Sequence, residues 1–129
     1  MPHNDLKMRT QAFARAVVDL VDRLPRGRSA DVIGRQLLRS GTSVGANYRS
    51  ACRARSRKEF IARMGIVEEE ADESQFWLDL IENCKFCTAE VVGTLRAEAG
   101  QLVAIAVSSI RTARRSPSTI PHSAFRTPH

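Results

Sequence analysis

One long amphipathic segment, residues 56–81, constrains the fold more than any other part of the chain. It opens with Ser56 and Glu59, the spacing of a capping box in which each side chain satisfies a free backbone amide of the first turn. Its apolar residues then recur at alternating steps of four and three: Phe60, Met64, Val67, Ala71, Leu78 and Ile81, with Ser74 in the one polar position. About seven turns keep this register. The segment therefore predicts a helix lying along the core of a bundle.

Three further segments carry the same helical periodicity. Helices are expected over residues 5–24, from residue 29 or 30 to the basic stretch at 49–55, and from the N-cap Thr88 to Arg115, with the long helix ending near 83–86. Connections this short force successive helices to lie antiparallel. The sequence thus predicts an all-α, up-down-up-down antiparallel four-helix bundle over residues 1–115. Residues 116–129 contain three prolines and no periodicity, so they are expected to form a disordered tail.

The second helix contains an unusual stretch, SGTSVGAN at residues 40–47. Each glycine there costs about 1 kcal/mol of helix stability relative to alanine. Small residues at this density also let a neighbouring helix come close, which offsets that cost. The alternative is a break in the helix between Gly41 and Gly45.

Composition and cysteine usage favour a soluble, cytoplasmic, single-domain protein. No run approaches the ~18 apolar residues of a membrane span, and the N-terminus MPHNDLKMRT lacks the apolar core of a signal peptide. The odd number of cysteines (Cys52, Cys84 and Cys87) suits a reducing compartment. Cys84 is expected to continue the apolar stripe, and Cys87 to lie in the following turn. The three histidines lie in expected tails, so no metal site and no cofactor are predicted.

Charge is distributed in blocks. Residues 1–63 carry fourteen basic and five acidic side chains, residues 64–95 carry one lysine and eight acids, and residues 96–129 carry five arginines and one glutamate. Such segregation favours pairing between surfaces, within a protomer or between protomers, and leaves a basic excess for an anionic partner.

The strongest candidate binding residues form a basic cluster where the second helix gives way to the third. Arginine dominates the chain, seventeen against three lysines, and its planar fork suits bidentate contacts with phosphate or carboxylate. Two interpretations, which do not exclude one another, are contact with RNA or DNA phosphates and pairing with the acidic part of a neighbouring protomer. The cluster consists of Arg49, Arg53, Arg55, Arg57, Lys58 and Arg63.

The acidic side chains of the long helix are interpreted as a solvated or intersubunit face. Glu69 and Asp72 are expected to point away from the core, and Glu70 and Glu73 to lie nearer its edge. Carboxylate di-metal sites in bundles also need histidines on the helices, and this chain has none there. A homo-oligomer interface is predicted at Ile66, Glu69, Glu70, Glu73, Phe76 and Trp77. Trp77 is expected to be an anchor of the core or interface rather than a stacking platform for bases.

No reaction chemistry is visible. The sequence offers no glycine-rich phosphate loop between a strand and a helix, no serine or cysteine beside a histidine base, and no paired acid and base. We therefore expect no enzymatic activity and no small-molecule substrate.

Three stretches resemble a bacterial family of four-helix-bundle proteins, which includes proteins encoded within intervening sequences of large-subunit ribosomal RNA genes. The match spans roughly residues 10–110. The first stretch is Gln36, Leu37, Leu38 and Arg39 followed by Ser43, Val44 and Asn47; the second is Arg55, Ser56, Lys58, Glu59, Phe60 and Ile61; the third runs from Glu69 to Ser74 and continues with Trp77, Leu78 and Leu80.

The resemblance implies a homo-oligomer, since relatives in this family form pentamers, and it implies no assigned enzymatic activity. A distant relative, the accessory variability determinant protein of diversity-generating retroelements, binds nucleic acid through a basic surface. Many members follow the helix 2 asparagine with Ile-Ala-Glu-Gly, whereas this chain has Tyr48, Arg49, Ser50 and Ala51, so a role of that glutamate does not carry over. The sequence predicts a homo-oligomeric nucleic-acid-binding accessory protein or, alternatively, a structural or protein-adaptor assembly that binds no nucleic acid.

Overall fold

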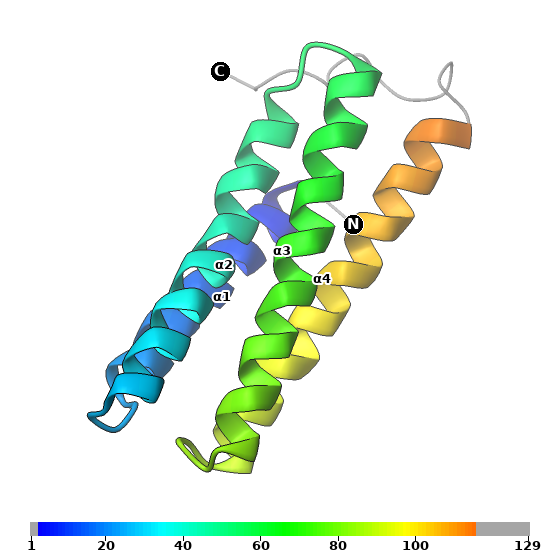
Figure 1. The fold of residues 1–129 in the computed structure, drawn as a ribbon. Helices are drawn as coiled ribbons and strands as arrows, with labels where there is room; N and C mark the ends of the chain where they lie inside the picture. Colours follow the sequence, from blue (N-terminus) through cyan, green and yellow to red (C-terminus); the bar gives the residue numbers. More distant parts are fainter. Residues whose placement is uncertain (1–2, 116–129) are drawn as a thin grey trace.

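The computed structural model describes residues 3–115 and shows four helices (Figure 1). They are α1 (His3–Asp22), α2 (Arg28–Cys52), α3 (Arg57–Asn83) and α4 (Ala89–Arg115). Each helix runs antiparallel to the one before it, and this part of the chain forms no strand. The predicted all-α, up-down-up-down four-helix bundle is confirmed. The expected tail at 116–129 lies outside the described residues.

The core is built from the predicted apolar stripes. On α3, all stripe residues after Phe60 are buried, including the polar Ser74, whereas Phe60 itself is half-buried beside the helix start. Helices α1, α2 and α4 contribute the other walls. Their buried members include Leu6, Phe13, Val17 and Leu20 from α1, Leu37, Val44, Tyr48 and Ala51 from α2, and Val92, Leu95, Ala99, Leu102, Ala106 and Ile110 from α4.

The four helix pairs do not contribute equally. Helix α3 packs extensively against both α2 and α4, and α1 packs mainly against α2. The contact between α1 and α4 is by far the smallest of the four. It includes a bidentate ion pair in which the Arg9 guanidinium donates to both Glu98 carboxylate oxygens at 2.7 and 3.0 Å, and a further Arg9 bond to Gln101 Oε1 at 3.0 Å. These bonds, called the Arg9 clamp below, connect α1 to α4 where the contact between the two helices is smallest.

Helix α2 is continuous through residues 40–47, so the alternative of a break is wrong. A Cβ atom built on Gly41 would lie 2.8 Å from Val17 Cγ2, which shows that α1 approaches α2 at this glycine. On another side of α2, the Ser74 hydroxyl donates to Ser40 Oγ at 3.0 Å inside the core. The small residues therefore serve close packing, as predicted.

The helix ends follow local hydrogen-bonding chemistry. Ser56 caps α3 by accepting a bond from the Glu59 amide at 3.0 Å, as predicted. The Glu59 carboxylate reaches the amide of Arg55 at 3.4 Å, so the reciprocal half of the box is displaced by one residue. Helix α1 ends at Asp22 rather than Leu24, because the last amides bond three residues back in a tightened final turn.

The turn between α3 and α4 corrects one prediction. Cys84 is exposed, and it is Cys87 that packs against the core. The reason is the C-terminal cap of α3: Lys85 adopts a left-handed φ of 61°, and Phe86 donates its amide to the Ile81 carbonyl at 3.0 Å. This reverses the chain, so that Phe86 and Cys87 cover the end of the core where a continued helix would have placed Cys84.

Candidate nucleic-acid interface and oligomer surface

All six residues of the basic cluster are exposed, and they gather at one end of the bundle. Arg49 lies in the last turn of α2, and Arg53 is the C-cap residue of that helix. Arg53 and Arg55 flank Ala54, which is completely buried, so the connection is fixed while its arginines face solvent. Arg57 and Lys58 begin α3, and Arg63 follows on the same helix. Because α2 ends where α3 begins, the six cations lie at the end of the bundle where the connection between α2 and α3 is found (Figure 1).

Pairing within the chain does not account for this basic cluster. Among residues 3–115, no ion pair joins any of its six members to a carboxylate. Arg57 and Lys58 also sit at a helix N-terminus, where a cation opposes the helix dipole at a cost of about 0.3–1 kcal/mol. Neither helix stability nor an internal salt bridge explains Arg57 and Lys58, whereas Arg49 and Arg53, at the C-terminal end of α2, complement the dipole of that helix.

Tyr48 does not supply an aromatic platform beside the cluster. Its side chain is only 4% exposed, and burial raises the pKa of the phenol. Burial likewise raises the pKa of the neighbouring Cys52 thiol. The basic surface therefore offers cationic donors rather than an exposed ring from this part of α2.

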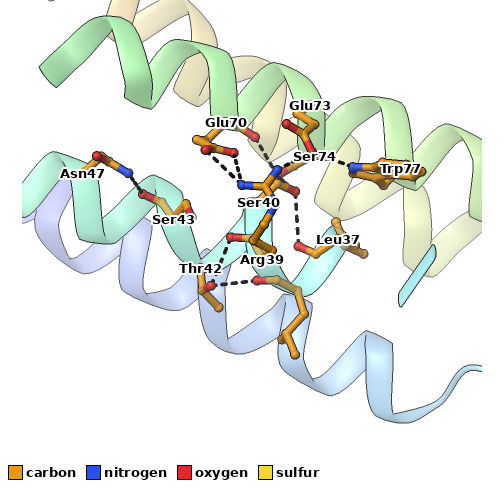
Figure 2. A network of polar contacts seen from close by, with 11 residues as sticks. Leu37, Arg39, Ser40, Thr42, Ser43, Asn47, Glu70, Glu73, Ser74 and Trp77 are labelled. Atoms are coloured by element: carbon orange, nitrogen blue, oxygen red, sulfur yellow. Dashed lines mark hydrogen bonds and ion pairs between the residues drawn. The ribbon is translucent and has the colours of Figure 1, made fainter. Parts of the chain in front are cut away.

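The acidic face of α3 divides as predicted. Glu69 and Asp72 are exposed, whereas Glu70 and Glu73 are half-buried and lean toward α2 (Figure 2). There Arg39 donates to both Glu70 oxygens at 3.2 Å and to Glu73 Oε2. Two of the residues expected at an oligomer interface thus already have a partner within the same chain.

Arg39 is the residue that sequence reasoning did not assign to this face. Its guanidinium and the Trp77 indole both reach Glu73, with Trp77 Nε1 donating to Oε2 at 3.0 Å (Figure 2). The indole bond and the Arg39 bond lower the pKa of the Glu73 carboxyl. The available signal was the antiparallel pairing of α2 with α3, which places residue 39 beside residues 70 and 73.

A second arginine pairs with acids near the C-terminal end of α3, within the acidic block formed by residues 64–95. Arg96 on α4 donates through Nη1 to Asp79 Oδ1 at 2.9 Å and to Glu82 Oε1 at 2.6 Å. Bonds from these two acids raise the pKa of the Arg96 guanidinium. Four of the eight acids in the block are therefore paired internally, whereas Glu69 and Asp72 face solvent.

The apolar residues of the predicted interface differ in exposure. Phe76 is 58% exposed, while Ile66 and Trp77 are half-buried. The Phe76 and Trp77 rings meet edge to face with centroids 4.9 Å apart and planes at 78°. Trp77 also packs against the core, consistent with its expected role as an anchor. The outer surface of α3 therefore carries the packed Phe76–Trp77 pair beside the Glu69 and Asp72 carboxylates, which form no ion pair within the described residues.

The described residues were also considered as possible metal ligands and as membrane-spanning segments, because either would define another kind of site. They contain no group of three or more histidine, cysteine, aspartate or glutamate side chains placed to hold a metal ion. One helix, α4, is long and apolar enough to cross a membrane by length and composition alone.

The fold and its basic end define a small helical-bundle protein with a cationic surface. The sequence profile of the family described as "23S rRNA-intervening sequence protein" matches residues 3–108, and the chain belongs to this family. No curated protein matches the chain. Among solved structures, it is similar to a protein with unknown function from the S23 ribosomal protein family of Bacteroides thetaiotaomicron VPI-5482, with 33% identity and a TM-score of 0.80. The match covers 86% of this chain and 99% of that one.

Proposed function

We propose that the protein is a homo-oligomeric accessory factor that binds RNA or DNA phosphates through the basic cluster. The observation that carries the proposal is the set of six exposed cations at one end of the bundle, none of them paired within residues 3–115. The description of the family, which refers to 23S rRNA, supports a nucleic-acid partner. Phosphate contacts of this kind position a protein without reading sequence.

Homo-oligomerisation is the second part of the proposal. An exposed Phe76 next to Trp77, with Glu69 and Asp72 unpaired, favours a self-contact on the outer face of α3. The family resemblance favours a pentamer. An assembly of this kind would repeat the basic cluster several times and multiply its phosphate contacts.

The same aromatic pair favours the second candidate, a protein-adaptor assembly that binds no nucleic acid. In that case the basic cluster holds protomers or protein partners. The expectations of a cytoplasmic location and of no enzymatic activity stay predictions.

An electrophoretic-shift titration separates the two functions. The wild type should shift structured RNA or duplex DNA at about 50 mM salt, and affinity should fall steeply as salt rises because counterions are released. Replacing Arg53, Arg55 and Arg57 by serine should weaken binding on every sequence. It should also reduce the slope of log affinity against log salt by about three for each protomer that contacts duplex DNA.

The matched control replaces Arg23, Arg26 and Arg28 by serine, which removes the same charge from exposed positions at the opposite end of the bundle. It should bind far more tightly than the basic-cluster variant. If the wild type gives no shift even at about 50 mM salt, nucleic-acid binding is excluded. If the basic-cluster variant loses its oligomeric mass instead, the arginines hold protomers together.

A further inference from the structure

The outer face of α4 carries a regular exposed stripe. Its residues recur at steps of four and three along the whole helix, and every one of them is exposed: Glu90, Thr94, Ala97, Gln101, Ala104, Ser108, Arg111 and Arg115. This is the heptad spacing by which one helix packs along another. Helix α3 packs on another side of α4, and α1 reaches only the edge of the stripe, where Arg9 donates to Gln101 Oε1 at 3.0 Å. Only 28% of the most apolar 18-residue window of α4 is buried.

The α4 stripe is uncharged except at its ends. Between Glu98 and Arg111 the helix has no charged residue, in a chain of which 26% is charged. Half-buried Val103, Val107 and Ile105 flank the stripe and add apolar surface on both sides of the small central residues. Small side chains at the contact allow two helix axes to approach to about 8 Å.

The charges at the two ends identify the occupant. The spacing of the stripe is symmetric about a point between Gln101 and Ala104, so an antiparallel second copy places Ala97 opposite Ser108 and Glu90 opposite Arg115 at both ends. A parallel copy would place Glu90 against Glu90 and Arg115 against Arg115. Among the described residues, neither Glu90 nor Arg115 has an ion-pair partner in its own chain.

We propose that α4 is a two-fold self-association surface on which a second copy of this chain packs antiparallel, with Glu90 of one copy facing Arg115 of the other. This contact is separate from the self-contact proposed on the outer face of α3. It would join protomers in pairs, whereas the α3 contact would generate a ring.

Sedimentation velocity of the intact chain tests the α4 surface. Ala104→Arg places a charge at the centre of the stripe and should abolish the pairing, so that the mass of the assembly falls by half. The matched control Ala12→Arg, at an exposed alanine of α1, should leave the mass unchanged. Glu90→Arg and Arg115→Glu should each weaken association about tenfold, since two equivalent surface pairs are lost. The two substitutions combined should restore it.

Cross-linking fixes the orientation. In a Cys84→Ser, Cys87→Ser background, Cys52 remains half-buried, and burial raises the pKa of its thiol. A mixture of the Ala97→Cys and Ser108→Cys variants should then form a disulfide-linked dimer under mild oxidation by glutathione disulfide. Neither variant alone should do so, because like positions lie about 16 Å apart along an antiparallel pair.

Three outcomes would overturn the α4 proposal. The first is that Ala104→Arg has the same assembly mass as the wild type. If Phe76→Ser lowers that mass in the same experiments, the α3 self-contact is supported without the α4 contact. The second is cross-linking of Ala97→Cys with itself, which would indicate a parallel pair. The third is that wild type and Ala104→Arg have the same mass, but only the wild type floats with phosphatidylglycerol vesicles. That result would assign the stripe to a membrane surface.

Discussion

Gly41 sets the distance between two helices through a missing methyl group. Its helix-propensity cost is about 1 kcal/mol. A Cβ at this position would lie 2.8 and 2.9 Å from the two Cγ atoms of Val17 and 3.2 Å from its Cβ, and the two shorter distances are below 3.0 Å, which real Cβ atoms essentially never show. Val17 is completely buried in the core. The close α1–α2 packing at this point therefore depends on glycine.

Gly41→Ala should lower the free energy of unfolding by about 1–3 kcal/mol, because overpacking outweighs the gain in helix propensity. The measurement is urea unfolding followed by circular dichroism at one fixed protein concentration. Gly65→Ala is the matched control: nothing lies within 4 Å of its added Cβ, so it should raise stability by up to about 1 kcal/mol. Equal stability of the two variants would contradict the packing role of Gly41.

At the scale of residues, the sequence predicted what local periodicity determines. The buried positions of α3 followed from their spacing, and the capping role of Ser56 followed from its own chemistry. The positions of Cys84 and Cys87 did not, because they depend on a left-handed φ at Lys85, a residue type that rarely adopts one. The sequence indicated close packing at Gly41 but did not identify α1 as the neighbour.

At the scale of elements, Arg39 joins α2 to α3. It pairs with Glu70 and Glu73, which lie 31 and 34 residues further along the chain, and Glu73 in turn fixes the Trp77 indole. The charge blocks predicted that acidic and basic surfaces would pair, and this pair lies within one chain. Which arginine pairs with which acid depends on the register of two packed helices, and no local pattern contains that register.

The Glu73 carboxylate, which accepts bonds from the Trp77 indole and from Arg39, should make stability depend on pH. Because the folded-state pKa of Glu73 is lowered, the stabilisation is complete above the unfolded pKa of about 4.3 and is lost as pH falls through the lower folded pKa. Glu73→Gln should therefore be less stable than wild type at neutral pH by up to about 1 kcal/mol, since both groups are partly exposed. The difference should disappear in acid.

A double-mutant cycle with Arg39→Gln isolates the pair. The matched control is Glu69→Gln, since Glu69 is exposed and no ion pair involves it within the described residues. Thermal unfolding between neutral pH and about pH 3 supplies the data. A Glu73→Gln variant whose deficit persists unchanged at low pH would show that packing of Trp77, rather than the carboxylate, was disturbed.

At the scale of the whole molecule, three surfaces differ in character. One end of the bundle is basic, the outer face of α3 combines carboxylates with Phe76, and the outer face of α4 is uncharged over most of its length. The basic end is the surface at which an anionic partner would be attracted most strongly. The family and the bundle were predictable from motifs and periodicity, whereas the division of the acidic block into paired and unpaired members required the packed structure.

Light scattering at about 150 mM salt should give a mass several times the 14.3 kDa of one chain. Phe76→Ser removes the exposed ring of α3 and should lower that mass by weakening protomer contacts at least tenfold, the effect of truncating an aromatic anchor. Met8→Ser is the matched control, because Met8 is 70% exposed on α1, outside both proposed self-contacts. A wild type that stays near the mass of a single chain at micromolar concentrations would refute assembly.

Helix α1 is expected to separate from the bundle before the other helices, because its contact with α4 is small. Helix α3 is held on both sides, whereas α1 has one extensive neighbour and a seam tied by the Arg9 clamp. The amides of α1 should accordingly exchange with deuterium earlier than those of α3, through partial openings that leave the other three helices paired. Such an opening would uncover the apolar side of α2 along its glycines. A second copy could then place its own α1 there, so α1 is the helix that would be exchanged in a domain-swapped dimer.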